Sequence, residues 1–275
     1  LSVAAIPEGL PAVLTITLAV GVQAMARRRA IVRRLPAIET LGSVSVICSD
    51  KTGTLTRNEM SVASVLDATG LVTVSGSGYA PHGQFQLGDQ VLAAADRPLL
   101  GELALAAALC NDAELRHDDG QWQVEGDPME GALLAFAAKG GLDLHAERGR
   151  WGRSDVIPFD AKHRFMATLN HDHEGSARVF VKGAPEQILA MCAQQQGPDG
   201  AAVALDMAYW QAGAERIAAN GQRVLALARR EVPPEHSVLE HSDLTGRLTL
   251  LGLVGLIDPP RDEAIAAVQE CHSAG

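Results

Sequence analysis

Basic residues are scarce in this chain, and that scarcity narrows the functions open to it. The 275 residues include 23 Lys and Arg against 33 Asp and Glu, a formal net charge of −10. A nucleic-acid groove needs a basic stripe, so this composition argues against one. Aromatic residues are also few, at 4 %, and small residues must supply much of the packing. The apolar fraction of 47 % still allows the core of one large domain or two ordinary ones.

Several common motifs are missing as well. The four cysteines (Cys48, Cys110, Cys192 and Cys271) form no CxxC pair, and no secretory signal precedes them. This favours reduced thiols in a cytosolic compartment. There is no GxxxxGK[ST] P-loop, no internal repeat and no low-complexity tract. The glycine-rich stretch "SGSGYAPHG" does not open a helix, so a flexible turn explains it better than a phosphate loop.

Charge is almost absent from the first 26 residues, where Glu8 stands alone. The segment "RRRAIVRR" follows at once, and its basic side chains are Arg27, Arg28, Arg29, Arg33 and Arg34. A signal peptide has the opposite order. The pattern therefore indicates the cytoplasmic end of a membrane helix, with the buried helix of a soluble protein as the alternative. Because the chain lacks an initiator Met and stops after a helix-like segment closed by Gly275, we expect an internal fragment.

The remaining pattern predicts alternating strands and helices, and hence an α/β or α+β fold. Strands are expected at Val44–Cys48, within 58–76, in a hairpin over 164–183, and over 222–232 and 247–258. Helices are expected over 1–26, 98–110 and 128–139, from Pro185, over 209–220, and after "DPPR". The segment "HDHEG" (171–175) could suggest a metal site, but a polar hairpin tip is the better interpretation.

The segment "VICSDKTGTLTRN" (46–58) carries the strongest chemical signal. Asp50 follows an expected buried strand, which is where open α/β sheets place their active sites. A carboxylate held there can attack a phosphoryl group, and the Thr-Gly-Thr that follows offers hydroxyl and backbone N–H groups to phosphate oxygens. Lys51 could also bind these phosphate oxygens, or it could be solvated. A capped turn between a strand and a helix explains the residues equally well.

Four segments together resemble the P-type ion-pumping ATPases: "PEGLP" (7–11), "DKTGTLT" (50–56), "KGAPE" (182–186) and "DPPR" (258–261). They occur in that family's order and approximate spacing. The calcium- and sodium-type branch is most similar, because the heavy-metal branch would show a Cys-Pro pair in the first segment. The resemblance implies a partial haloacid-dehalogenase-like Rossmann phosphorylation domain, a large inserted α+β nucleotide-binding domain, and part of a transmembrane helix before them.

The resemblance also implies domain bounds. Residues 1–26 would be the cytoplasmic half of a broken transmembrane helix, and 27–58 the first part of the phosphorylation domain. Residues 59–257 would form the nucleotide-binding domain, and 258–275 the truncated start of the second part of the phosphorylation domain.

In such a protein Asp50 is the phosphorylated aspartate, and Lys51, Thr52 and Thr54 belong to the catalytic segment. Phosphatases of the same fold carry a second acid two positions after the first, where this chain has Thr52. Without that general base the acyl phosphate can last long enough to drive a conformational change. Asp50 and the Thr52 carbonyl would ligate Mg²⁺, and Thr54 would lie near the transferred phosphoryl group.

The resemblance further implies a set of ATP-binding residues: Glu130, Phe159, Arg164, Lys182, Gly183, Arg223, Asp258 and Arg261. Glu130 would lie near the adenine amino group, Phe159 would stack on the base, and Lys182 would stand at the mouth of the pocket. Arg223, Asp258 and Arg261 would contact phosphates. Arg164 stands where the family usually has Lys, and Ala161 where it often has a basic residue. Taken singly, Phe159 could be a core aromatic and Lys182 a solvated surface lysine.

Glu8 between two prolines suggests a cation site, because Pro7 and Pro11 free backbone carbonyls at membrane depth. By resemblance Glu8 and the carbonyls of Val3, Ala4 and Ile6 would bind the transported ion, with Ca²⁺ first among the candidates. A kinked helix with a snorkelling acid is the alternative.

We therefore expect a fragment of a multi-pass, ATP- and Mg²⁺-dependent cation pump of the plasma membrane, with most of this chain cytoplasmic. The family's later "TGD" and "GDGxND" segments are absent, so the fragment alone should bind nucleotide without transporting. The alternatives are a soluble haloacid-dehalogenase-like phosphatase and a non-catalytic ATP-binding module.

Overall fold

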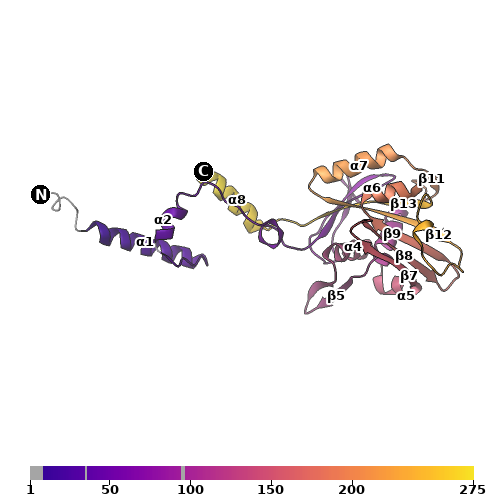
Figure 1. Cartoon of the computed structure of the whole chain (residues 1–275), viewed down its shortest axis with the longest axis horizontal. Coiled ribbons are helices and arrows are strands. Elements are labelled where there is room, and N and C mark those ends of the chain that lie inside the picture. The colour runs from indigo at the N-terminus through magenta and orange to yellow at the C-terminus, as the bar shows by residue number, and fades with distance from the viewer. Residues whose placement is uncertain (1–8, 35, 94–96) are drawn as a thin grey trace. The chain divides into compact units, whose positions relative to one another are not determined.

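The chain forms two compact units in a computed structural model that describes residues 9–34, 36–93 and 97–275 (Figure 1). One unit comprises the residues up to Lys51 together with Ile265–Gly275, and the other comprises Thr52–Ala264. The helix α8 (Asp262–Ala274) begins in the second unit and continues into the first. Each unit is described separately below.

The smaller unit contains α1 (Leu10–Arg27) and α2 (Pro36–Leu41). Its helix α1 begins after Gly9 and has Pro11 in its first turn. Proline is tolerated there because backbone N–H groups in the first turn have no hydrogen-bond partner within the helix. At 18 residues and a mean hydropathy of 1.5, α1 is long and apolar enough to cross a membrane. None of its side chains is buried, and Leu10, Val13, Leu14, Ile16 and Val20 are exposed.

The predicted buried strand Val44–Cys48 is wrong for this chain. Residues 44–50 have no regular secondary structure, and the side chains of Val44, Val46 and Ile47 are exposed. A strand persists only when neighbours satisfy its backbone groups, and within the described ranges no strand pairs with this segment. The apolar sequence of this segment favours a strand, but the segment forms none in this structure.

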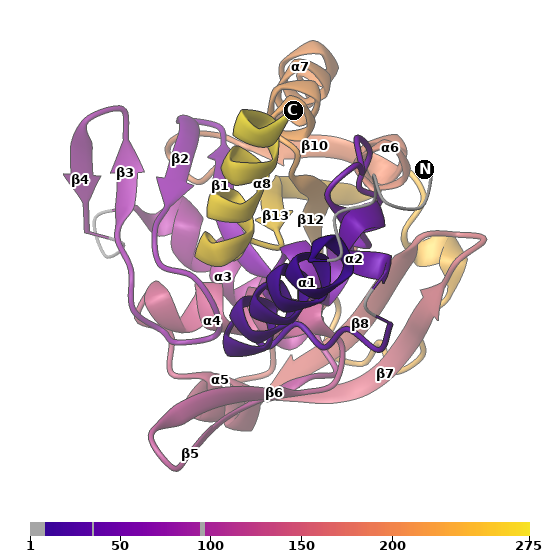
Figure 2. The ribbon, with the colours of Figure 1, turned by 90° about the vertical axis from the view of Figure 1, so that its left-hand side faces the viewer.

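The larger unit is built on a mostly antiparallel sheet. Its strands are β1 (Ser61–Asp67), β2 (Gly70–Val74), β3 (Phe85–Leu87), β4 (Gln90–Leu92), β7 (Trp151–Asp160), β8 (Phe165–Asp172), β9 (Ala177–Gly183), β10 (Cys192–Gln196), β11 (Ala202–Ala204), β12 (Arg223–Val232) and β13 (Leu248–Ile257). The order is β4-β3-β2-β1-β13-β12-β9-β8-β7, with β10 parallel to β13 and paired with β11. Figure 2 shows this progression from β4 on one side to β7 on the other. A separate hairpin is formed by β5 (Glu114–Asp118) and β6 (Gln121–Glu125).

Helices cover both faces of the sheet. On one face lie α3 (Pro98–Leu109), α4 (Pro128–Lys139) and α5 (Leu144–Arg150), and on the other lie α6 (Pro185–Met191) and α7 (Met207–Ala219). Figure 1 shows α4 and α5 on one side of the sheet and α6 and α7 on the other. The alternation of side chains along a strand divides the core accordingly. In β9, for example, Phe180 packs toward α3 and α4, whereas Val179 and Val181 pack toward α6 and α7.

Most of the predicted elements of this unit are confirmed. The helices at Pro98 and Pro128 begin where predicted, the β8–β9 hairpin encloses the polar turn, and α6 begins at Pro185. The polar turn at "HDHEG" is the hairpin tip, where the carboxylate of Asp172 accepts hydrogen bonds from the backbone N–H groups of Glu174 and Ser176. These bonds, that from Ser176 first, hold the pKa of Asp172 below its ordinary value.

Candidate functional site

A buried ion pair marks one end of the face covered by α3 and α4. Lys182, the last residue but one of β9, is only 7 % exposed, and its Nζ donates to Oε1 of Glu130 in the first turn of α4. The backbone N–H of Asp112 donates to Oε2 of Glu130 at 2.9 Å. Lys182 is therefore not a solvated surface lysine, and its charge is kept inside the domain by a specific partner.

Local sequence explains how α4 presents Glu130. The carboxylate of Asp127 accepts hydrogen bonds from the backbone N–H groups of Met129 and Glu130 at 2.8 and 3.3 Å, and Pro128 occupies the first turn. The helix therefore has a fixed start. Because Glu130 lies in that first turn, the position of its carboxylate is set by the cap.

The strand junction beside Lys182 requires a glycine. A Cβ added to Gly183 would meet the carbonyl oxygen of Arg164 at 2.5 Å and Cβ of Phe165 at 2.7 Å. Arg164 itself has a φ of +56°, in the left-handed region, and its carbonyl accepts a hydrogen bond from the N–H of Ala184. The Arg164 guanidinium extends over the surface to Glu186, with Nη1 2.6 Å from Oε1.

Two further predicted residues present side chains at the surface. Phe159 lies in β7 and is 64 % exposed, so it is not a core aromatic. An exposed ring of this size offers a flat face for stacking. Arg223, at the start of β12, places Nη1 3.3 Å from Sδ of Met129, the residue next to Glu130. Arg223, Met129, Glu130 and Lys182 thus lie in one neighbourhood.

Asp258 and Arg261 join the two segments that enter and leave the sheet. The Asp258 carboxylate accepts from Oγ1 of Thr56 at 2.6 Å, and Nε of Arg261 donates to the Thr56 carbonyl at 3.0 Å. A second Arg261 nitrogen donates to the carbonyl of Gly53 at 3.4 Å. Thr56 also pairs with Pro260 as a short antiparallel bridge. We call this set of contacts between residues 53–59 and 258–261 the clasp. Asp258 and Arg261, both predicted to contact phosphates, are engaged in the clasp in this structure.

The predicted catalytic segment lies at the boundary between the two units. Asp50 and Lys51 belong to the smaller unit and are exposed, whereas Thr52 and Thr54 belong to the larger one. Thr52 is extended, with φ −73° and ψ 122°, and Gly53 has a φ of +75°. The predicted cation ligands Glu8, Val3, Ala4 and Ile6 lie outside the described residues.

Asn111 was not predicted from the sequence, although it is central to the site's geometry. It is 2 % exposed, and its Nδ2 donates both to the carbonyl of Ala107 at 3.1 Å and to that of Glu130 at 2.9 Å. Its Oδ1 accepts from the N–H of Ala113 at 2.9 Å. A signal was present: a polar residue directly after an Ala-rich apolar helix usually has a structural or capping role.

The neighbouring thiol of Cys110 is fully buried and shares this environment. Burial raises its pKa, and the nearby positive charges of Lys182 and Arg153 oppose that rise. Its Sγ lies 3.5 Å from the carbonyl of Met166, the residue paired with Lys182 across β8 and β9. The thiol therefore belongs to the packed wall of the site.

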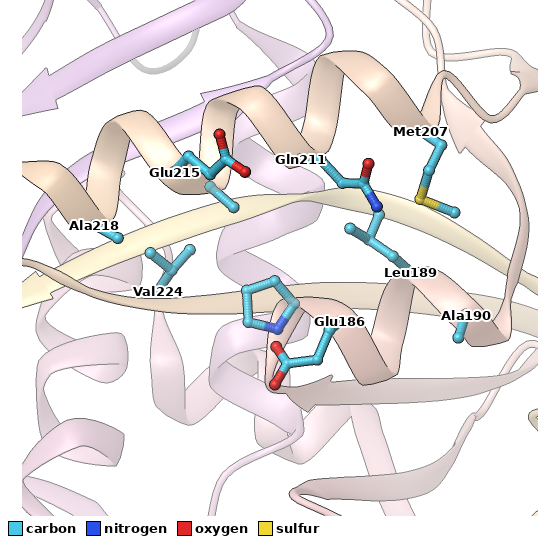
Figure 3. Close-up of a pocket in the computed structure, with 10 residues that line it drawn as sticks. Glu186, Leu189, Ala190, Met207, Gln211, Glu215, Ala218 and Val224 are labelled. Atoms are coloured by element: carbon cyan, nitrogen blue, oxygen red, sulfur yellow. The ribbon is translucent and has the colours of Figure 1, made fainter.

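A groove lies on the face of the sheet that α6 and α7 cover. It has a volume of about 670 Å³ between α6 and α7, and Figure 3 shows the two helices on either side of Val224. Its lining is Pro185, Glu186, Leu189, Ala190, Met207, Gln211, Ala214, Glu215, Ala218 and Val224. Two carboxylates and no cation among these ten residues make it unsuited to a triphosphate. Its size does not outweigh the charge argument, so we assign the candidate site to the Lys182–Glu130 face.

The mostly antiparallel sheet with helices on both faces agrees with what comparison with known proteins shows. Residues 99–263 match the family model described as "P-type ATPase, cytoplasmic domain N". The chain therefore belongs to the P-type ATPase family.

Three relatives show the breadth of the similarity. The chain is 48 % identical to the "Cation-transporting ATPase pma1" of Synechocystis sp., and its whole length covers 31 % of that protein. It is 38 % identical to the "Calcium-transporting ATPase" of Bacillus subtilis, covering 31 %, and 40 % identical to the human "Calcium-transporting ATPase type 2C member 1", covering 29 %. The chain thus spans about a third of the length of the curated relatives it matches.

Proposed function

We propose that this chain is part of an ATP-driven cation pump, and that its larger unit is the part that binds ATP. The observation that carries the proposal is the buried ion pair of Lys182 and Glu130, and the same unit also exposes the ring of Phe159. A buried cation and an ordered acceptor can orient a nucleotide, and an exposed aromatic ring supplies a stacking surface. The relatives named as cation- and calcium-transporting ATPases support this assignment.

The nucleotide site would use residues from four strands or helices. Phe159 stacks on adenine, Glu130 accepts from its amino group, and Lys182 and Gly183 form the mouth of the pocket. Arg164 and Arg223 supply positive charge at the surface, and Asp258 and Arg261 join the phosphate contacts when the clasp rearranges. Residues 59–257 would then be the nucleotide-binding domain.

The phosphorylation domain would be assembled from residues 27–58 and 258–275 with later parts of the protein, in a haloacid-dehalogenase-like Rossmann fold. In that sheet Val44–Cys48 would gain the strand neighbours that it lacks here. The relatives, about three times as long as this chain, support the presence of such partners.

In the proposed reaction a carboxylate oxygen of Asp50 attacks the γ-phosphorus of ATP, ADP leaves, and an aspartyl phosphate forms. Lys51 and Thr54 would hold the transferred phosphoryl group. Thr52 carries no carboxylate, so the phosphoenzyme is not hydrolysed by a neighbouring base. Asp50 and the Thr52 carbonyl are oxygen donors of the kind Mg²⁺ prefers, and the ion would neutralise phosphate charge when bound.

The transported cation would bind in the membrane near Glu8 and the carbonyls of Val3, Ala4 and Ile6. Oxygen ligands of this kind suit Ca²⁺, which we propose as the first candidate. The apolar helix α1, with arginines after it, supports insertion of this segment into a membrane. We propose that it is one span of a multi-pass protein of the plasma membrane.

The test is phosphorylation of the complete protein in membranes from labelled ATP, with Ca²⁺, Na⁺, Mn²⁺ and K⁺ supplied in turn. We expect label that requires one ion, is released by hydroxylamine and is absent from the Asp50→Asn variant. Label that persists in that variant would refute the role of Asp50. Release of phosphate from small esters without ATP would support a phosphatase instead.

A further inference from the structure

We propose that Asn111 is a positioning residue that makes the nucleotide site select adenine over guanine. The inference rests on the proposed function, because it concerns how Glu130 is presented to a bound base. Asn111 does not reach the base itself. It acts by fixing both the backbone and the side chain of Glu130.

The first step concerns the three hydrogen bonds of the Asn111 side chain. Its two Nδ2 hydrogens are committed to the carbonyls of Ala107 and Glu130, and its Oδ1 to the N–H of Ala113. The side chain therefore ties the end of α3 to the first turn of α4 and to its own turn. An amide is the group that can donate twice and accept once from one point, and a carboxylate cannot.

The second step is the carboxylate of Glu130. With Asn111 holding the turn, the N–H of Asp112 points at Oε2 of Glu130 at 2.9 Å, while Lys182 donates to Oε1. Both oxygens thus accept from fixed donors, and lone pairs remain for a further donor. An ordered carboxylate that can only accept favours a purine with an amino group at C6, and it repels a carbonyl at the same place.

The third step is the support behind Asn111. Two nitrogens of Arg153 reach this turn: Nη2 donates to the carbonyl of Asn111 at 2.6 Å and to that of Leu109 at 3.2 Å, and Nη1 pairs with Asp112. Arg148 adds a hydrogen bond to the carbonyl of Ala113 at 3.0 Å. Arg153 is therefore placed to influence Glu130 through Asn111 and Asp112, two contacts away from Glu130.

Adenine and guanine differ at the position that this argument uses. Adenine carries an amino group at C6, and guanine carries a carbonyl there. If the turn loosens, Glu130 becomes free to move away from an approaching carbonyl, and ATP loses its ordered acceptor. A loosened turn therefore lowers ATP affinity and relieves the repulsion of GTP, and both changes lower the ratio of ATP to GTP affinity.

The test compares dissociation constants for ATP and GTP, measured by calorimetry on the full 275-residue chain in mild detergent. The variants are Asn111→Asp, which keeps the shape and removes both donors, and Arg153→Lys, which weakens the support and leaves the buried turn in place. Asn220→Asp is the matched control, since the amide of Asn220 donates only to the carbonyl of Arg216 in the last turn of α7. Glu130→Gln serves as the reference for a changed acceptor.

We expect the wild type to bind ATP about tenfold or more tightly than GTP. Asn111→Asp should bring that ratio close to one, Arg153→Lys should lower it about threefold, and Asn220→Asp should leave it unchanged. General destabilisation would weaken both nucleotides alike and would not change the ratio. An unchanged ratio in a folded Arg153→Lys chain and in Asn111→Asp would overturn the role of Asn111. Failure of the wild type to bind either nucleotide would instead overturn the proposed function.

Discussion

At the scale of single residues, burial decides which thiols of this chain can react. Cys48 and Cys271 are exposed, whereas Cys110 and Cys192 are buried. Burial raises the pKa of both inner thiols, that of Cys192 to about 12. At neutral pH neither is a ready nucleophile, in spite of the lysine and arginine near Cys110.

The first prediction follows from that difference. A thiol reagent at pH 8 should modify Cys48 and Cys271 rapidly, and it should modify Cys110 and Cys192 only as fast as the larger unit opens. Peptide mass spectrometry of timed samples measures each site separately. Rapid modification of Cys110 in the folded chain would contradict its complete burial.

Gly183 gives a second prediction at this scale. Gly183→Ala should lower the free energy of unfolding by about 1–3 kcal/mol, because the new methyl group overlaps the backbone of Arg164 and Phe165. Gly101→Ala is the matched control: it lies exposed within α3 with open space around it, and it should stabilise the chain by about 1 kcal/mol. Urea denaturation measures both, and equal effects would show that Gly183 is not sterically required.

At the scale of helices and strands, a buried ion pair fastens the start of α3 to the β1–β2 turn. The Asp67 carboxylate is fully buried and accepts from Nη2 of Arg97 at 3.0 Å and from the N–H of Thr69 at 2.7 Å. Tyr209 of α7 donates to the carbonyl of Asp67 at 2.7 Å. One turn thus links helices from both faces of the sheet.

Removing one member of this pair leaves a buried charge without its partner. Arg97→Ala should therefore lower the free energy of unfolding by about 3 kcal/mol. Arg116→Ala in the exposed β5–β6 hairpin also removes an ion pair, but there solvent screens the charges, and little change is expected. Comparable losses in the two variants would show that burial does not set the strength of the Arg97 contact.

The long connection between β12 and β13 is held by a carboxylate whose pKa is depressed. The backbone N–H groups of Leu239 and Val156 donate to Asp155 at 2.8 and 2.9 Å, and both bonds lower its pKa below the ordinary 3.8. A depressed pKa in the folded state contributes stability above the unfolded pKa and loses it as the pH falls through the folded value.

The pH dependence of stability is therefore predictable in sign. Asp155→Ala should melt at a lower temperature than the wild type at pH 7, and the gap should close as the pH falls below about 3.8. Thermal unfolding followed by circular dichroism between pH 2.5 and 7 measures the gap. A gap that stays constant over that range would mean that the ionised carboxylate is not what holds the loop.

The elements also show how far sequence reasoning reaches. Proline at a helix start and alternation in a strand are local signals. They correctly predicted the β8–β9 hairpin and the helices that begin at Pro98, Pro128 and Pro185. Val44–Cys48 carries the same apolar signal as a buried strand, but strand formation depends on partners elsewhere in the chain. Short strands such as β10 and β11 have little local pattern and were not predicted.

The site shows the same division. Motifs predicted Lys182 and Glu130 separately, and no local pattern could indicate that their side chains meet, because they lie 52 positions apart. Asn111 was missed for a related reason: beside its local partners Ala107 and Ala113, its side chain donates to the carbonyl of Glu130, 19 positions away in the sequence. Whether the motif residues contact ATP stays a prediction.

At the scale of the whole molecule, the chain divides between Lys51 and Thr52, so that the exposed Asp50 and the well-packed larger unit belong to different units. The family match over residues 99–263 lies entirely within the larger unit. We expect that the chain by itself binds ATP and does not turn it over, since the phosphorylation domain proposed above needs segments outside this chain, and the curated relatives are about three times as long.

The measurement that tests this most directly is calorimetric titration of ATP into the 275-residue chain, beside Lys182→Gln and Phe159→Ala. The control is Arg247→Gln, an exposed cation outside the candidate site. We predict one site per chain, a loss of about tenfold or more in affinity for each site variant, and none for the control. No binding by the wild type, or equal affinity in all four proteins, would contradict the assignment of the Lys182–Glu130 face as the nucleotide site.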